Sequence, residues 1–395
     1  MVQKSSLAQG YEWLRAARWL RVPLLAFTIS RLGIVLIAYL AVPLVINASS
    51  PPPYHIRPDN TLLDVFGSRW DTGFYLSIAQ EGYRYREVEL PSVAFFPLLP
   101  LMIRALTTLT GDALVAGLII TNTALLLATM LFYRLVDEEW GPAVAGRAVW
   151  YLLIFPAAFL GSAIYSESLF LLGAIGSLYF FRRGYWESAA LLGLATALSR
   201  TLGLILAPTL LVEWWMQRHR RPPETRPPVK ALLAPAAVPL GTAAYMYYLH
   251  IAFGDPLAFL RGMAAWERQL QSPLATIASL FQRPAEGWTP ALLTGRIHLN
   301  NWMDFLFVLM FLGLALILLY RRRWSEGLFV LLGTIIPASS GLLMSQRRYM
   351  WVLFPAYIVL ARWGDRPWVD KAITTFSLMA LALFTAMFAK GYWVG

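Results

Sequence analysis

One carboxylate, Asp71, stands in the first long polar stretch of the sequence and is surrounded by aromatic residues. Apolar residues recur every four positions around it, at Trp70, Phe74 and Ile78. This spacing predicts a helix over 69–79 with one face in a membrane surface, and it places Tyr75 beside the acid. A carboxylate in this position can accept the proton of a hydroxyl group, as a general base does. The alternative is a helix-start acid that pairs with Arg69 or is solvated at the interface.

Two further polar residues interrupt apolar sequence. Glu167 follows Tyr165 and Ser166 between two apolar runs. An acid within the membrane is costly, so Glu167 is a candidate functional group, or else it belongs to a polar turn exposed to water. Arg200 lies between short apolar segments, where it either forms a turn or binds a phosphate through paired hydrogen bonds. We favour phosphate binding.

Three more arginines stand out by their position. Arg347 and Arg348 depart from the rule that Lys and Arg gather on the cytoplasmic side, because their neighbours place them outside. An anionic ligand would explain this pair, and a different topology is the alternative. Arg31 lies within the first apolar span, where it either faces the same cavity or pairs with an acid of the bundle.

Metal and nucleotide sites find little support. The four histidines are scattered without metal-ligand spacing and the chain has no cysteine. We therefore predict no metal site and no bound cofactor, although this pattern leaves room for a divalent cation. The sequence has no glycine-rich phosphate loop and no soluble domain to hold one, which argues against a nucleotide-dependent reaction.

Apolar runs recur throughout the 395 residues, of which 58% are hydrophobic and 14% charged. This composition predicts an all-α polytopic membrane protein, because a membrane-spanning helix needs about 20 apolar residues and satisfies its own backbone. Membrane topology and anionic lipids account for the formal net charge of +11. We therefore predict membrane lipids, and no nucleic acid, as partners.

The distribution of Lys and Arg predicts about eleven spans in a single domain, residues 1–395. We place them near 23–46, 113–133, 148–165, 168–181, 187–199, 202–217, 231–252, 302–320, 327–343, 349–362 and 371–390. Several are too short for a straight crossing, so they must be broken, tilted or buried in the bundle. On the outer side we expect a first loop over 47–112 with amphipathic interfacial helices, one of them partly inserted over 95–109. A second outer loop over 253–301 should lie on the membrane surface, and 11–22 should form a basic interfacial helix.

Five pieces of the sequence, in order, resemble the PIG-V-like family of mannosyltransferases, the group that includes GPI mannosyltransferase 2. They are 69–83, 95–100, 155–158 with 165–170, 199–203 and 348–355. The family's Arg-x-Asn-Gly corresponds here to 200–203, where Leu202 replaces the asparagine. The resemblance implies a GT-C type membrane fold whose first outer loop supplies an acid as catalytic base, and Asp71 matches that acid. Glu167 and Arg200 match the family's second and third motifs.

The resemblance further implies a glycosyltransferase, in particular a mannosyltransferase, with a polyprenyl- or dolichyl-phosphate-linked donor and a glycan or glycolipid acceptor. In an inverting displacement one carboxylate takes the hydroxyl proton, and arginines stabilise the leaving phosphate. We predict Asp71 as this base. We predict binding of the donor phosphate or substrate by Arg31, Arg69, Tyr75, Tyr165, Glu167, Arg200, Arg347 and Arg348.

We expect a multi-pass protein of a prokaryotic plasma membrane rather than of the endoplasmic reticulum, with its active site on the extracytoplasmic or luminal side. The alternative function is a polytopic lipid or solute transporter or flippase, since intramembrane Arg and Glu also mark substrate pathways.

Overall fold

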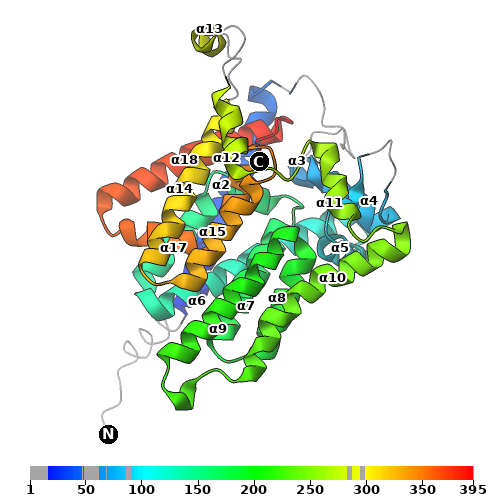
Figure 1. Cartoon of the computed structure of the whole chain (residues 1–395). Coiled ribbons are helices and arrows are strands. Elements are labelled where there is room, and N and C mark those ends of the chain that lie inside the picture. The colour runs from blue at the N-terminus through cyan, green and yellow to red at the C-terminus, as the bar shows by residue number, and fades with distance from the viewer. Residues whose placement is uncertain are drawn as a thin grey trace.

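The computed structural model describes residues 17–46, 48, 62–67, 69–85, 90–282, 287–293 and 299–394. Within these ranges the chain is all-helical and has no β-strand, as predicted (Figure 1). The longer helices are α2 (Arg18–Leu44), α5 (Leu98–Thr110), α6 (Ala113–Ile154), α7 (Glu167–Arg182), α8 (Trp186–Ser199), α9 (Leu206–Arg220), α10 (Leu233–Phe253), α14 (Leu299–Tyr320), α15 (Trp324–Ala338) and α18 (Pro367–Ala389). The shorter ones are α3 (Leu62–Gly67), α4 (Asp71–Glu81), α11 (Ala258–Gly262), α12 (Pro273–Ala278), α13 (Trp288–Leu293), α16 (Gln346–Trp351) and α17 (Pro355–Trp363).

Five of the described helices are long and apolar enough to cross a membrane, and the chain is an integral membrane protein. They are α2, α6, α10 with the turn before it, α14 and α18. The larger number of spans predicted from the sequence is not confirmed. Four of the other expected spans correspond to α7, α8, α9 and α15, which have 16, 14, 15 and 15 residues. A straight crossing needs about 20 residues.

One element, α6, covers the expected span at 113–133 and the first part of the one at 148–165. It consists of two helical segments joined by a kink at Gly141, whose φ of 79° and ψ of 169° lie outside the helical range. The charged residues between the expected spans are helical, and Glu138 among them pairs with Arg183 at the end of α7. The second segment ends at Ile154, before the expected end of that span at residue 165.

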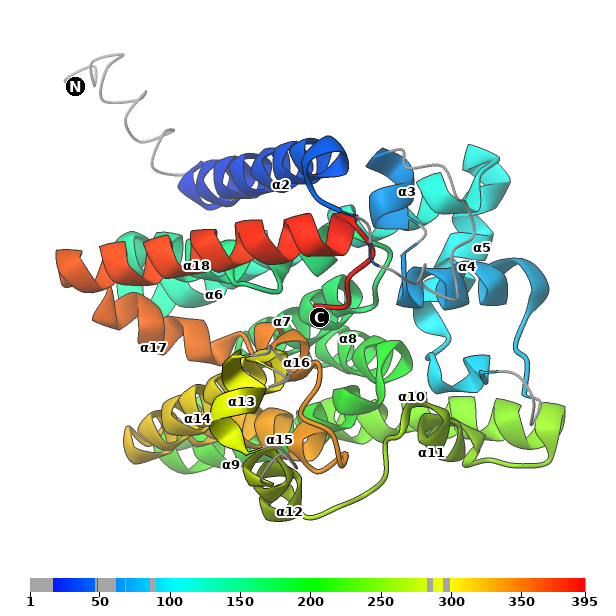
Figure 2. The same ribbon diagram turned by 90° about the horizontal axis from the view of Figure 1, so that it is seen from above.

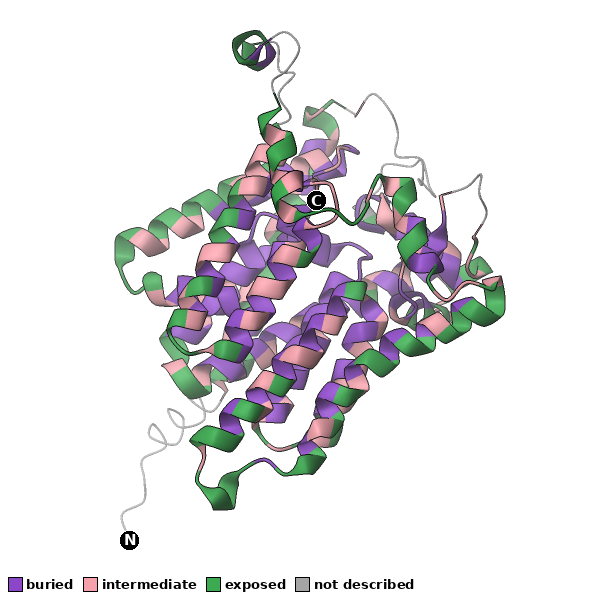
Figure 3. Ribbon diagram, viewed as in Figure 1, coloured by how far each residue is buried: buried purple, intermediate pink, exposed green. Residues whose placement is uncertain are grey.

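The helices form layers around α7 and α8. Seen from above, α2, α6 and α18 lie side by side on one side, and α9, α14 and α15 lie on the other (Figure 2). The buried faces point toward the centre of the bundle, whereas the outward faces are exposed (Figure 3). Large apolar residues on these outward faces, such as Leu25, Tyr39 and Leu306, are about 60% exposed, as expected for helices that contact lipid.

α7 is held at its C-terminal end by a buried ion-pair network. Arg182 Nε lies 3.1 Å from Glu213 Oε1 of α9, and Arg182 Nη2 lies 2.9 Å from Glu326 Oε1 of α15. Both carboxylates are almost fully buried, and Ser325 donates a further hydrogen bond of 2.6 Å to Glu213. Charges removed from water are stable only when they are paired in this way. The network therefore fixes the register of α7 and with it the position of the residue that begins the helix.

Two of the helices predicted within 47–112 are present. α4 covers Asp71–Glu81 where we expected 69–79, and α5 covers Leu98–Thr110 where we expected 95–109. Together with α3 and α11 they gather at one corner of the molecule, at the N-terminal end of α7 (Figure 1). Of the expected helix over 11–22, residues 11–16 lie outside the described residues, and α2 already begins at Arg18.

Candidate active site

Four charged side chains that are distant in sequence meet at the N-terminal end of α7. Glu167, the first residue of α7, is fully buried and pairs through Oε1 with both Arg200 and Arg348. The Arg348 guanidinium also contacts the Asp71 carboxylate through Nη1. Arg348 therefore bridges the two acids. Its side chain is only 9% exposed, whereas that of Asp71 is 20% exposed, so Asp71 is the acid that a substrate can reach.

Helix ends place these residues. Asp71 and Glu167 are the first residues of α4 and α7, where the helix dipole favours a negative charge. Trp70 turns the chain into α4 with a φ of 54°, which is uncommon for a residue with a side chain. Arg200 follows the last residue of α8 in an extended conformation, and its guanidinium reaches the start of α7.

Two of the predicted tyrosines line the cluster. The Tyr75 hydroxyl donates to Ser166 Oγ at 2.9 Å. Burial raises the pKa of Tyr75 above its usual range, so the phenol stays a neutral hydrogen-bond donor at physiological pH. The Tyr165 ring lies against Arg348, with 4.7 Å between the guanidinium carbon and the ring centroid. The Tyr165 hydroxyl donates to the carbonyl of Arg69 at 3.5 Å.

Arg347 is turned away from the cluster although it precedes Arg348. Its Nε lies 3.2 Å from Asp304 Oδ1 in α14, and both side chains are fully buried. Asp304 also accepts the backbone N–H groups of Ser345 at 2.9 Å and of Arg347 at 3.0 Å. Ser345 has a φ of 75°, so Asp304 stabilises an uncommon turn that leads directly into Arg348. Asp304 is therefore a positioning residue for Arg348.

We expect Asp304→Asn to lower the free energy of unfolding by about 1.5–3 kcal/mol, because hydrogen bonds to a charged acceptor are lost. The thermal unfolding midpoint in detergent measures the effect. Asp365→Asn is the matched control, since Asp365 pairs with Arg147 but is 61% exposed and such pairs contribute little. Equal midpoints for the two variants would contradict the role given to Asp304.

Arg31 is buried elsewhere. It donates to the carbonyls of Leu153 at 3.2 Å and Ala158 at 2.9 Å, and to Ser162 Oγ at 3.0 Å. Leu153 lies in the last turn of α6, and Ala158 and Ser162 lie in the short helical turn between α6 and α7. Buried backbone carbonyls at such positions need hydrogen-bond partners. Arg31 thus supports the backbone that leads to Glu167 rather than the cluster itself.

The structure divides the predicted residues into two groups. It brings together Asp71, Tyr75, Tyr165, Glu167, Arg200 and Arg348. It places Arg31 and Arg347 in other buried contacts. Arg69 is buried near Asp64. Burial lowers the pKa of the Arg69 guanidinium, and the charge of Asp64 offsets part of this effect. Only the backbone carbonyl of Arg69 has a described bond to the first group.

Arg268, in the segment 253–301, was not among the predicted residues, yet it reaches this site. Its guanidinium carbon lies 5.7 Å from the ring centroid of Tyr349, and that of Arg200 lies 5.2 Å from the same centroid. Arg268 donates to Ser340 Oγ at 2.9 Å and to the Met344 carbonyl at 3.1 Å. A basic residue on the expected outer side is the signal that could have found it. The contact between Arg268 and Tyr349 joins residues with 80 others between them in the sequence.

Aromatic rings pack together at the start of α4. Phe74 of α4 stacks on Phe95 at 4.4 Å between ring centroids, and Trp266 packs edge-on against both rings. Trp393 lies 5.2 Å from Trp70. The nearby charges are largely buried, which strengthens the electrostatic interactions between them.

Among the described residues no group of three or more His, Cys, Asp or Glu side chains could hold a metal ion. The charged atoms of the cluster are carboxylate oxygens and guanidinium nitrogens, and guanidinium groups do not bind cations.

The fold of the chain is similar to that of an archaeal oligosaccharyltransferase, AglB from Archaeoglobus fulgidus. In the structure of AglB with an inhibitory peptide and a dolichol-phosphate, the identity is 12% and the TM-score 0.47, over 97% of this chain and 57% of that one. For the apo form of the archaeal oligosaccharyltransferase the identity is 14% and the TM-score 0.47, with the same coverage. This chain thus spans a little over half the length of those structures.

No curated protein sequence matches the chain. Residues 44–219 match the model of the family described as Mannosyltransferase (PIG-V). This region is a little under half of the chain and includes Asp71, Glu167 and Arg200, whereas Arg268 and Arg348 lie beyond it. The match agrees with the resemblance seen in the motifs over residues 44–219, which include four of the five pieces.

Proposed function

We propose that this protein is a membrane mannosyltransferase of GT-C type that transfers the sugar of a polyprenyl- or dolichyl-phosphate-linked donor to a hydroxyl of a glycan or glycolipid. The observation that carries the proposal is the bridge of Arg348 between Asp71 and Glu167, with Arg200 on the other side of Glu167. This bridge places Asp71, which is partly accessible, next to arginines that can bind a phosphate.

The reaction is a single displacement with inversion. The acceptor oxygen forms a bond to the anomeric carbon while its proton passes to the Asp71 carboxylate. The bond between the anomeric carbon and the phosphate oxygen breaks, and its electron pair stays on the lipid phosphate. Arg200 and Arg348 offset the charge that grows on this phosphate. A phosphate is a good leaving group, so the second acid of an inverting hydrolase is not required.

Donor binding also releases the base. The incoming phosphate competes with Asp71 for the Arg348 guanidinium, and Arg348 keeps its contact with Glu167. Glu167 Oε2 has no hydrogen-bond partner among the described residues. A buried acceptor without a donor is costly, and a hydroxyl of the sugar can supply the missing hydrogen bond.

Arg268 supplies positive charge that the carboxylates do not balance. Arg200 and Arg348 share Asp71 and Glu167, so these four side chains are formally neutral together. The described partners of Arg268, Ser340 Oγ and the Met344 carbonyl, are both uncharged. We therefore assign Arg268 to the donor phosphate, which needs a cation beyond the paired ones.

We expect Arg268→Gln to raise the KM for the donor about tenfold or more with kcat little changed, because a hydrogen bond to a charged group contributes about 1.5–3 kcal/mol. Arg268→Lys should retain part of the binding, since it keeps the charge but loses the fork of donors. Steady-state kinetics with varied donor measure both. Arg261→Gln is the control, as Arg261 lies in the same loop, is 67% exposed and pairs with Asp255. A large loss of kcat with unchanged KM in Arg268→Gln would refute this assignment.

The two ends of α7 support a proposal for the side of the membrane. Glu167 lies at one end, and Arg182 and Arg183 lie at the other, near the basic turn at 321–323. Clusters of Lys and Arg mark the cytoplasmic side. This arrangement supports an active site on the extracytoplasmic or luminal side, and we propose a prokaryotic plasma membrane as the location.

The purified full chain in proteoliposomes tests the proposed function directly. Radiolabelled mannose on polyprenyl phosphate is offered together with a panel of glycan and glycolipid acceptors. A mannosylated product with inverted configuration is expected. Uptake or flipping of the labelled lipid without any transfer product would instead identify a transporter.

A further inference from the structure

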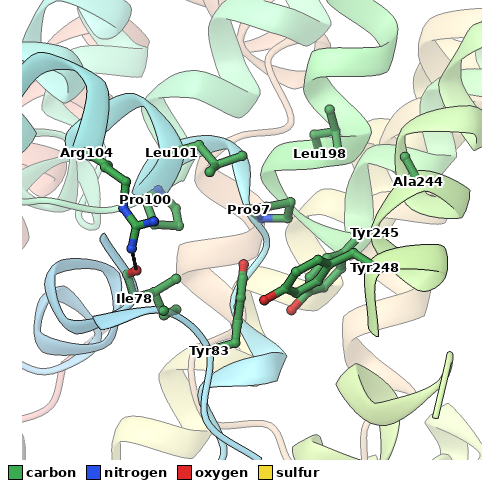
Figure 4. Close-up of a pocket in the computed structure, with 11 residues that line it drawn as sticks. Ile78, Tyr83, Pro97, Pro100, Leu101, Arg104, Leu198, Ala244, Tyr245 and Tyr248 are labelled. Carbon is green, nitrogen blue, oxygen red and sulfur yellow. Dashed lines mark hydrogen bonds between the residues drawn. The ribbon is translucent and has the colours of Figure 1, made fainter. Parts of the chain in front are cut away.

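A cavity of about 340 Å³ lies beside the charged cluster but is lined by different residues. Its walls come from the end of α4, the start of α5, α8 and α10. Tyr83, Tyr245 and Tyr248 gather on one side of it, and Arg104 and Ile78 lie on the other (Figure 4). The volume falls in the range of about 300–1,000 Å³ that is usual for ligand sites.

Three of the polar lining side chains are bound to backbone oxygens, and the cavity presents mainly hydrocarbon. The Tyr83 hydroxyl donates to the Phe95 carbonyl at 2.8 Å, and the Tyr245 hydroxyl donates to the Val93 carbonyl at 2.8 Å. Arg104 Nε donates to the Ala79 carbonyl at 2.6 Å. Since these groups are bound to backbone oxygens, the cavity favours an apolar occupant.

The cavity opens toward lipid at the level of the outer leaflet. Two lining residues, Leu101 and Tyr248, are 59% and 44% exposed. Tyr248 and Ala244 precede Phe253, the end of the membrane-spanning α10, by five and nine residues. At about 1.5 Å per residue they lie roughly 7 and 13 Å inside the helix end. That depth is within the outer half of a hydrocarbon core about 30 Å thick.

Two elements connect the cavity to the charged cluster. Asp71, Tyr75 and Ile78 follow each other along one face of α4 at spacings of four and three. Ile78 lines the cavity and lies about 10 Å along the helix from Asp71. On α8, Leu198 lines the cavity two residues before Arg200. The first carbons of a chain attached to a phosphate at Arg200 would therefore start near the apolar cavity.

We infer that this cavity binds the first part of the hydrocarbon chain of the lipid-linked donor. The inference rests on the proposed function, because it takes the phosphate at the arginines as the point from which the chain starts. A bulk phospholipid is the other source of a hydrocarbon chain. The position of Leu198 two residues before Arg200 favours the donor, since only the donor must place its phosphate at Arg200.

The test fills the cavity in the full-length protein. Ala244→Trp should raise the KM for a long-chain polyprenyl-phosphate mannose about tenfold. This is the loss of binding affinity expected when about two methylene groups of the donor can no longer enter the cavity. The substitution should leave the KM for a water-soluble analogue with a very short alkyl chain unchanged. Leu101→Trp, from the opposite wall, is the second variant in case the first does not fold.

Leu240→Trp is the matched control, because Leu240 lies one turn away on α10, is 59% exposed and does not line the cavity. Equal effects of Ala244→Trp on long-chain and short-chain donors, or no effect on either, would overturn the inference and point to bulk lipid. A binding measurement separates this result from failure of the proposed function. Polyprenyl phosphate without sugar should raise the unfolding midpoint of the wild type more than that of Ala244→Trp, even if no transfer occurs.

Discussion

Asp71→Asn should lower the rate of sugar transfer about 10²–10⁴-fold, the contribution typical of a positioned general base. The amide cannot take the acceptor proton, but its oxygen can still accept a hydrogen bond from Arg348. Arg348 also keeps Glu167 as partner, so the fold should survive. Single-turnover transfer from polyprenyl-phosphate mannose measures the rate, and the unfolding midpoint in detergent reports the fold.

Glu81→Gln is the matched control for this variant. Glu81 lies at the other end of α4, is 50% exposed and pairs with Arg84. Its loss should leave transfer unchanged. If Asp71→Asn transferred mannose at the wild-type rate, Asp71 would not be the base, whatever the donor proves to be.

Glu167→Gln should be the most destabilising of these substitutions, with a loss of about 3–5 kcal/mol, the cost of breaking a buried ion pair by removing one partner. Glu167 is fully buried, and its carboxylate faces two guanidiniums that are at most 10% exposed. Without the charge of Glu167, Arg200 and Arg348 repel each other in a site with little water. Transfer should fall as well, because both arginines lose the group that orients them.

The unfolding midpoint of Glu167→Gln should be compared with that of Glu187→Gln. Glu187 also lies in the first turn of a helix, but it is exposed and pairs with Lys230 on the surface. A double-mutant cycle with Arg200→Gln should show strong coupling, since the two side chains are in contact. Additive effects, or a midpoint equal to that of Glu187→Gln, would show that the buried bridge contributes little.

Only part of the candidate site could be predicted from the sequence. Asp71 and Tyr75 lie one turn apart in α4, and this arrangement could be predicted because it follows from helical periodicity over four residues. Glu167 and Arg200 were recognised as unusual because charged residues are rare in apolar sequence. Arg347 and Arg348 look equivalent in the sequence, yet one is bound to Asp304 and the other bridges the two acids.

The sequence by itself determined the class of the protein and the charged residues that needed an explanation. Composition decided that the chain is helical and embedded in the membrane, because lipid leaves no other way to satisfy the backbone. Local periodicity decided the helices of the first outer loop. The tertiary structure alone decided that the charged residues between two expected spans are helical up to a kink at Gly141, and that Arg268 joins the site. It also decided which of two neighbouring arginines faces the acids. Such facts depend on contacts between residues far apart in the chain, and packing and ion pairing select these contacts only once the bundle has formed.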